Sequence, residues 1–300
     1  MSALEPAGRP RPVDAVEPPS PSAGEAREIL AGPKGTFVVV AFRKGPCESR
    51  FYRFRLTGDG RVEGMEPLRR EPVPAPVAGL AISPDGDRLA YTTAPCASGA
   101  RRAAEPRATV TVSDLGSGRR RTWSTAAPSV IGEIAWAGDG RTLGYAVSDV
   151  RPDDSSGSGV PPGQMYAPIG RGLGSVTVHA LDTRARGTDL RAGRVLFRGP
   201  ADSGSVTTAV MNPDGRTGYG VMRTTRPPST VLFSFSEGEP MRVTTTIPQK
   251  PNTLMAIAFM NDDGPRHACL NGLDAFGRVI DGGFLGNSDG AASCGPAYAY

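Results

Sequence analysis

The chain has 300 residues and a formal net charge of +4 at pH 7, and it is rich in glycine (39) and proline (29). Its hydrophobic content of 38% is low, which favours many short strands joined by turns over long helices. No run of about 18 apolar residues occurs, so no membrane span is predicted within the chain. No secretory signal follows Met1, which predicts a cytoplasmic protein, or an extracytoplasmic, membrane-tethered one if an anchor lies upstream.

The basic charge is scattered along the chain. It consists almost entirely of arginine, and the arginine clusters at 69–70, 101–102 and 119–121 lie far apart with acidic residues among them. A nucleic-acid-binding protein would gather such charge on one face together with aromatic residues. The pattern therefore predicts solvated loops and no nucleic-acid partner.

The N-terminal segment differs from the rest of the chain. Residues 1–33 are rich in proline and contain few apolar side chains. Such a segment cannot bury enough apolar surface to offset the entropy lost on ordering, so we expect a disordered tail or linker. The folded domain is expected over residues 34–300.

Four later segments repeat one pattern, in which a short apolar strand leads into an Asp-Gly turn and a second strand follows. They are residues 80–86, 134–140, 210–215 and a decayed copy at 257–264. In the first three, the carboxylate can bond to the backbone of its own turn, and the glycine can adopt the left-handed conformation of a tight hairpin. These residues, interpreted as structural rather than as metal ligands, are Asp85, Gly86, Asp139, Gly140, Asp214 and Gly215.

A second hairpin follows each clear copy, at 109–124, 176–197 and 231–246, so the repeating unit has four antiparallel strands. That unit is the design of a propeller blade. Residues 37–65 supply three further strands, and the inner strand missing from that blade could come from the C-terminal residues. The predicted fold is all-β, a β-propeller of five four-stranded blades, with six blades or an incomplete ring as alternatives.

The repeat resembles that of TolB-like (WD-repeat-like) β-propeller proteins. The resemblance is carried by Ser83-Pro84-Asp85-Gly86 and its copies, each followed by a strand with tyrosine, and it extends over residues 34–283. The arginine-rich composition and the tail ahead of the repeats also resemble actinobacterial proteins of this type, which are often exported or membrane-tethered. The resemblance implies a binding platform, or a propeller appended to a hydrolase, and it supplies no catalytic residues.

No catalytic, cofactor or metal site is predicted. His179 and His267 are isolated from one another and are interpreted as structural strand residues, because a general base needs a positioned partner. No Cys-x-x-Cys spacing for zinc is present. The segments at 153–157 and 287–290 are weak calcium-like sequences without the spacing of an EF-hand loop, and we interpret them as flexible loops.

The four cysteines suggest two disulfides. Cys47 and Cys96 each follow the second strand of a blade, which predicts a Cys47–Cys96 pair on one face, with Cys269–Cys294 as the second pair. Free buried thiols are the alternative. Disulfides would imply an oxidising compartment, which conflicts with the absence of a secretory signal. A missing N-terminal segment would resolve this conflict.

Two long connections, at 94–108 and 149–174, are expected on the same face of the blades. Loops of this length are uncommon unless they are functional or disordered. The second contains Met165, Tyr166 and Ile169, which we predict to contact a protein or small-ligand partner, the alternative being that they pin the loop onto its own blade. The predicted function is a non-enzymatic binding or scaffold domain. The alternatives are a regulatory or sensor ectodomain fragment of a membrane-tethered protein, and an enzyme with a polar site in the propeller channel.

Overall fold

The structure is a computed structural model. It describes residues 2–4, 10–12, 14–16, 19–69, 71–94, 96, 107–150, 173–199, 204–248, 254–260, 267–273 and 279–285. The chain forms two compact units. The first comprises Met1–Arg43, Arg50–Glu71 and Pro248–Tyr300, and the second comprises Lys44–Ser49 and Pro72–Ile247.

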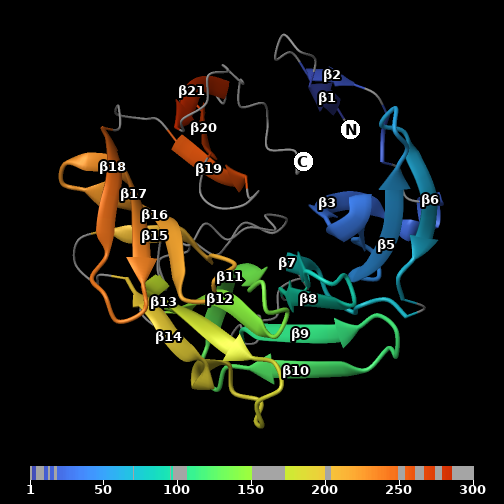
Figure 1. The fold of residues 1–300 in the computed structure, drawn as a ribbon, viewed down its shortest axis with the longest axis horizontal. Helices are drawn as coiled ribbons and strands as arrows, with labels where there is room; N and C mark the ends of the chain where they lie inside the picture. Colours follow the sequence, from blue (N-terminus) through green and yellow to red (C-terminus); the bar gives the residue numbers. More distant parts are fainter. Residues whose placement is uncertain are drawn as a thin grey trace. The chain divides into compact units, whose positions relative to one another are not determined.

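The second unit contains three four-stranded antiparallel sheets, and the strands of each sheet are consecutive in the chain (Figure 1). Sheet 2 consists of β7 (Val77–Ile82), β8 (Arg88–Thr93), β9 (Thr109–Asp114) and β10 (Arg120–Ser124). Sheet 3 consists of β11 (Ser129–Trp136), β12 (Thr142–Val150), β13 (Leu173–Asp182) and β14 (Arg194–Arg198), with the single-turn helix η3 (Leu190–Ala192) between the last two. Sheet 4 consists of β15 (Ser205–Met211), β16 (Thr217–Thr225), β17 (Pro228–Ser236) and β18 (Arg242–Pro248).

The first unit contains sheets of the same kind. Sheet 1 consists of β3 (Glu25–Ala31), β4 (Thr36–Arg43), β5 (Glu48–Leu56) and β6 (Val62–Pro67). Sheet 5 has three described strands, β19 (Leu254–Met260), β20 (His267–Leu273) and β21 (Val279–Leu285). The remaining elements are β1 (Ser2–Leu4), which pairs with β2 (Pro10–Pro12), and the single-turn helices η1 (Pro21–Ala23) and η2 (Pro33–Gly35).

Within the described residues, five antiparallel meanders therefore follow one another, four of them with four strands. Helix in the described residues is confined to three 3-10 turns. Because consecutive four-stranded meanders are the blades of a propeller, the predicted fold class, an all-β protein of the β-propeller type, is confirmed.

One strand lies where the sequence predicted disorder. β3 falls within residues 1–33 and pairs antiparallel with β4, with Ile29 opposite Val39. Ile29 also packs against a buried cluster that includes Ala23 and Phe54. The expected tail is therefore structured at 25–31, and these residues, not the C-terminal ones, supply the inner strand of sheet 1. A few apolar contacts suffice because β4 provides the backbone hydrogen-bond partners.

The Asp-Gly turns of sheets 2, 3 and 4 form as their sequence predicts. Asp139 Oδ1 accepts hydrogen bonds from the backbone N–H groups of Arg141 and Thr142, both at 2.8 Å. Asp214 makes the equivalent pair of bonds, and Asp85 accepts from the backbone N–H of Asp87 at 3.1 Å. The glycine that follows each carboxylate has positive φ; the values are 81° at Gly86, 58° at Gly140 and 71° at Gly215. The turn carboxylates are thus committed to local backbone bonds.

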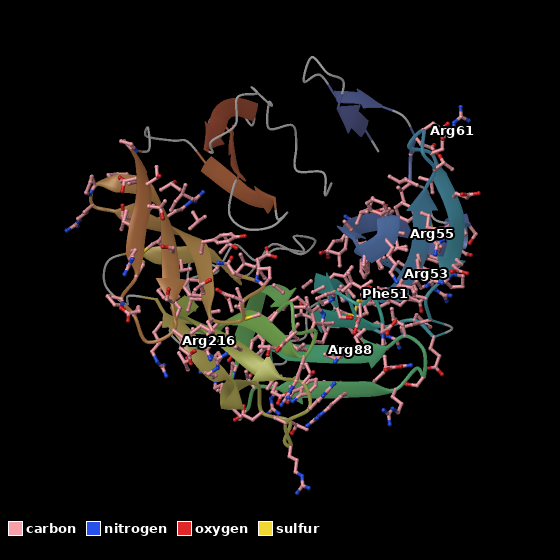
Figure 2. The ribbon with its side chains drawn as sticks, in the orientation of Figure 1. Phe51, Arg53, Arg55, Arg61, Arg88 and Arg216 are labelled. Atoms are coloured by element: carbon pink, nitrogen blue, oxygen red, sulfur yellow. A yellow bond between two sulfur atoms is a disulfide. The ribbon has the colours of Figure 1, made fainter. Side chains whose placement is uncertain are left out.

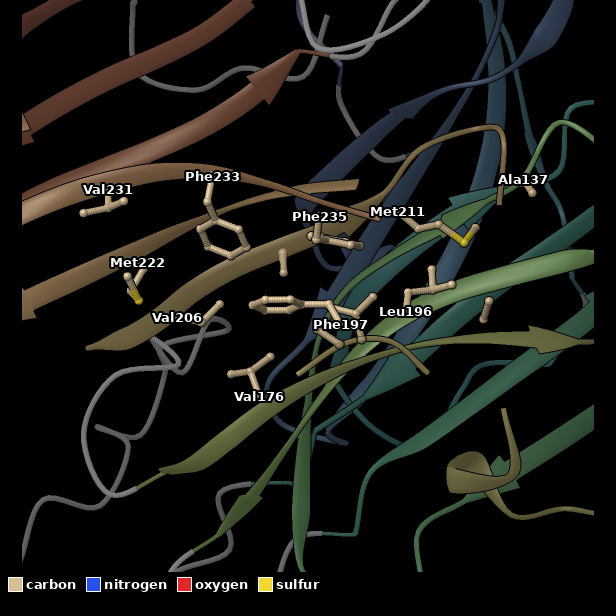
Figure 3. Close-up of a cluster of buried hydrophobic side chains, with 14 residues drawn as sticks. Ala137, Val176, Leu196, Phe197, Val206, Met211, Met222, Val231, Phe233 and Phe235 are labelled. Atoms are coloured by element: carbon tan, nitrogen blue, oxygen red, sulfur yellow. The ribbon is translucent and has the colours of Figure 1, made fainter. Parts of the chain in front are cut away.

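A large buried cluster fills the space between sheets 3 and 4 (Figure 3). Phe197 of β14 lies 5.1 Å, centroid to centroid, from both Phe233 and Phe235 of β17. β16 carries glycine where these rings approach: a Cβ at Gly218 would lie 2.2 Å from Phe235, and one at Gly220 would lie 2.5 Å from Phe233. The glycines of this strand therefore make room for aromatic packing.

Candidate binding surface

In the second unit, corresponding ends of the inner strands of neighbouring sheets lie side by side. At the end where each inner strand turns into the second, here called the turn end, the Gly138 N–H of sheet 3 donates to the Pro213 carbonyl of sheet 4 at 2.7 Å. At the opposite end, a Cβ at Gly79 of β7 would lie 3.7 Å from the Gly132 carbonyl of β11. Since β8–β9 and β12–β13 are both joined at this opposite end, both long connections leave from it. We call it the loop end.

The connection after β8 is fixed at its base. A disulfide joins Cys96 to Cys47, which lies between β4 and β5, and their Cα atoms are 6.1 Å apart. The hydroxyls of Thr93 and Thr109, at the two ends of the connection, lie 3.0 Å apart. The loop is therefore held by a covalent bond on one side and by a hydrogen bond across its base.

An ion pair holds the start of the connection after β12. Asp149, next to the end of β12, forms an ion pair with Arg191 of η3. Arg191 Nη2 also donates to Ser129 Oγ at 3.2 Å, and Ser129 is buried at the start of β11. This network ties the inner strand, the second strand and η3 together where the loop begins.

One backbone carbonyl links the two loop bases. The N–H of Ala108, just before β9, donates to Thr125 Oγ1 at 3.2 Å, and that hydroxyl donates to the Ala127 carbonyl at 2.9 Å. Ser129 Oγ donates to the same carbonyl at 3.1 Å and lies 3.4 Å from Asp149 Oδ1. Thr125 and Ser129 are both almost fully buried. A continuous chain of polar contacts thus joins the base of one long loop to the base of the other.

The inner strands also share an irregularity near the loop end. Each four-stranded sheet has one extra residue in its inner strand; in β11 it lies between Ile131 and Ile134. Bulges of this kind re-aim side chains. Glu133 lies in the β11 bulge with an exposed side chain, and desolvation by the protein around it raises the pKa of its carboxyl. Glu133 is not among the residues predicted from the sequence, although a carboxylate within a mainly apolar strand could have indicated it.

Several predicted residues lie outside the described part of the chain. Met165, Tyr166 and Ile169, the predicted partner contacts, fall at 151–172, and Cys294 falls after β21. Cys269 is on β20, and nothing is described of its side chain. The Cys269–Cys294 pair and the loop contacts therefore remain predictions.

One motif in the sequence runs counter to the prediction that no catalytic residues are present. Residues 286–290 read Gly-Asn-Ser-Asp-Gly, which matches the Gly-x-Ser-x-Gly spacing of a serine-hydrolase nucleophile elbow around Ser288. The motif follows β21 and lies outside the described residues. In hydrolases the elbow joins a strand to a helix and needs a positioned base, so the spacing alone is weak evidence for catalysis.

His179 is buried within sheet 3, and its surroundings are those of a structural residue. Its ring stacks on that of Tyr145, with centroids 5.7 Å apart, and Nδ1 lies 3.0 Å from the Gly193 carbonyl. Within the described residues, no group of three or more His, Cys, Asp or Glu side chains is arranged to hold a metal ion. No described helix is long and apolar enough to cross a membrane.

Arginines on the outer hairpin of sheet 1 face acidic residues. Arg53 and Arg55 lie on β5, and Arg61 precedes β6 (Figure 2). Arg53 Nε donates to Glu66 Oε1 at 3.0 Å, and Arg55 pairs in register with Glu63. Positive charge here is matched by negative charge on the neighbouring strand, in line with the mixed charge pattern of the sequence.

No protein-family model and no curated protein matches the sequence. Among solved structures, the chain is similar to a prolyl endopeptidase, with 13% identity, a TM-score of 0.48, and coverage of 88% of this chain and 35% of that one. It is also similar to Kuenenia stuttgartiensis hydrazine synthase, with 14% identity, a TM-score of 0.46, and coverage of 87% and 71%. For a Pyrococcus horikoshii acylaminoacyl peptidase the identity is 14%, the TM-score 0.44, and the coverage 85% and 38%.

The chain thus spans 35% of the prolyl endopeptidase chain and 38% of the acylaminoacyl peptidase chain. At these identities and TM-scores the similarities carry no argument about function. The sheets themselves define the class of the protein, an all-β chain of consecutive propeller-type blades.

Proposed function

We propose that this chain is a non-enzymatic β-propeller binding module, built from TolB-like repeats, that contacts a protein partner through the loop end of its second unit. The observation that supports this best is the chain of polar contacts from Ala108 through Thr125, Ala127 and Ser129 to Asp149. A binding surface needs loops that are variable in sequence but start from fixed positions.

The turn end offers a useful contrast. Its carboxylates are committed to backbone bonds, and its turns pack on one another through contacts such as Gly138 to Pro213. The long connections leave from the loop end instead. This asymmetry favours the loop end as the surface that meets a partner.

The test uses the full chain and a partner identified by cross-linking to it. In one variant, residues 165–169 are replaced by a Gly/Ser segment; the matched control, Glu239→Arg, changes an exposed charge at a turn between β17 and β18. We expect the loop variant to bind the purified partner at least about tenfold more weakly, with an unchanged unfolding midpoint, and Glu239→Arg to bind as the wild type does.

Other outcomes would decide against the proposal. Unchanged affinity in the loop variant would place the partner elsewhere, and a large drop in its unfolding midpoint would show that these residues pin the loop to its blade. Labelling of the wild type by a fluorophosphonate probe, abolished by Ser288→Ala, would favour the enzyme alternative.

A further inference from the structure

Among the described residues, one ring nitrogen of His179 has a hydrogen-bond partner and the other has none. Its side chain is buried on β13, with 3% of its surface exposed. Nδ1 lies 3.0 Å from the carbonyl oxygen of Gly193, and since a carbonyl only accepts, Nδ1 carries the proton. In the neutral ring Nε2 is then the unprotonated nitrogen, and it is buried without a hydrogen-bond partner among the described residues.

The rings of His179 and Tyr145 both bond to the segment that connects β13 to β14. Residues 183–193, here called the return segment, connect β13 to β14. His179 bonds to Gly193 at the end of the segment, and the Tyr145 hydroxyl donates to the carbonyl of Leu190, whose side chain is fully buried. The stacked rings of Tyr145 and His179 thus position each other as well as the segment.

The rest of the return segment is held from sheet 2. Arg121 donates from Nη1 to the Thr183 carbonyl at 3.1 Å and from Nη2 to the Gly187 carbonyl at 2.9 Å. Asp189 forms a parallel bridge with Ser124. None of these contacts changes protonation in the neutral pH range, so His179 is the titratable contact among those named here.

Protonation of His179 would place a proton and a charge in a buried site. The new N–H at Nε2 would have no acceptor among the described residues, which is costly in a buried position. Arg191 of η3 and Arg198 of β14 repel a positive charge here, while Asp189 attracts it. Tyr145 of β12 stays neutral because burial raises its pKa, and β15, which packs on β13, contributes no titratable side chain. Burial dominates, and it lowers the pKa of His179.

We propose that His179 is an acid-sensitive latch, and that protonation of its Nε2 releases the return segment from sheet 3. In the released state the imidazole is in water, with an ordinary pKa near 6.5. The closed state binds protons less readily, so closure is favoured at pH values above about 6.5 and weakens as the pH falls towards the folded-state value. The opening equilibrium then rises by up to about tenfold per pH unit in this window.

The experiment is hydrogen exchange of the full chain between pH 7.5 and 5.5, with rates corrected for intrinsic exchange. Protection of amides in the return segment should fall by up to about tenfold per pH unit below pH 6.5, while amides of β8 and β9 keep theirs. His179→Asn, whose Nδ2 can replace the Nδ1 donor but does not titrate, should abolish the dependence. His267→Asn, at the other histidine of the chain, should leave it intact.

Three results would overturn the proposal: pH-independent protection of the return segment in the wild type, persistence of the dependence in His179→Asn, or equal loss of protection in β8 and β9. Should His179→Asn fail to fold, NMR titration of the wild-type histidines decides instead. The proposal then requires a pKa below 6.5 for His179 and an unprotonated Nε2 at neutral pH.

Discussion

The indole nitrogen of Trp136 on β11 donates a hydrogen bond to the backbone carbonyl of Ala81 on β7, 3.2 Å away. Both residues are buried, and the Arg88 guanidinium lies 5.2 Å from the centroid of the indole ring. Arg88 in turn lies 3.5 Å from Asp85 of the sheet 2 turn. A single side chain therefore joins sheets 2 and 3 through an apolar, a cation–π and a hydrogen-bond contact.

Trp136→Phe should lower the free energy of unfolding more than Trp123→Phe does. Both tryptophans are buried under an arginine, but hydrogen bonding of the indole is described for Trp136 alone. The difference should be about 1 kcal/mol, with a further cost if the Ala81 carbonyl is left unsatisfied. Urea denaturation of the two variants measures it, and equal losses would show that the bond contributes nothing.

Gly144→Ala should destabilise the second unit by about 1–3 kcal/mol, because the added methyl overpacks the interface of sheets 3 and 4. A Cβ at Gly144 would lie 2.5 Å from Met211 Cβ, which cannot swing away as the end of a side chain can. Gly58→Ala is the control, since nothing lies within 4 Å of its added methyl and its cost should stay within about 0.5 kcal/mol. Similar unfolding midpoints for the two variants would contradict this account.

Cys47→Ser/Cys96→Ser should lower the stability of the oxidised chain by about 2–5 kcal/mol, because the bond restricts the unfolded state across a sequence separation of 49. Denaturation with and without dithiothreitol is the measurement. Reductant should destabilise the wild type towards the level of the variant. Cys269→Ser/Cys294→Ser serves as a control that retains the first bond, and an oxidised wild type no more stable than Cys47→Ser/Cys96→Ser would contradict the prediction.

Asp182 should titrate well below an ordinary aspartate. Arg141 Nε donates a hydrogen bond to Asp182 Oδ1 at 2.8 Å. Hydrogen bonding from Arg141 is the main reason that the pKa of Asp182 is lowered to about 2. Since the folded-state pKa lies below the ordinary value of 3.8, the unfolded chain binds more protons in this interval. The stabilisation is therefore present above about pH 4 and is lost as the pH falls towards 2.

Carbon-detected NMR titration of the carboxyl groups checks this value. Arg141→Gln should move the pKa of Asp182 back towards 3.8. Arg61→Gln, which removes the ion pair with Asp59 in sheet 1, should leave Asp182 unchanged. A pKa near 4 for Asp182 in the wild type would show that the Arg141 contact does not persist in solution.

The parts of the fold that depend on local sequence were predictable. The strand predicted to follow the first Asp-Gly turn is β8 (Arg88–Thr93), because the preceding turn at Asp85 and Gly86 and the alternation of its residues specify it locally. β3 was missed because its sequence, with two glutamates and an arginine in seven residues, carries no strand pattern and orders only against β4.

Contacts between sheets could not be predicted from the sequence. Gly144 is needed because a larger residue at this position would collide with Met211, which lies far away in the sequence. The same holds for the candidate site: the cysteine pair followed from equivalent positions in two repeats, whereas the Asp149–Arg191–Ser129 network joins residues that share no repeat position. Such contacts depend on how the chain packs, which periodicity does not specify.

The disulfide between Cys47 and Cys96 also changes what a break in the chain does. The covalent ring that it closes contains β5, β6, β7 and β8, and so includes parts of both compact units. A protease cut at any single peptide bond inside this ring leaves one covalent molecule, which separates into two fragments only after reduction. Exposed turn residues within the ring, such as Gly58 and Asp59, can therefore be sites of cleavage that releases neither piece of the chain.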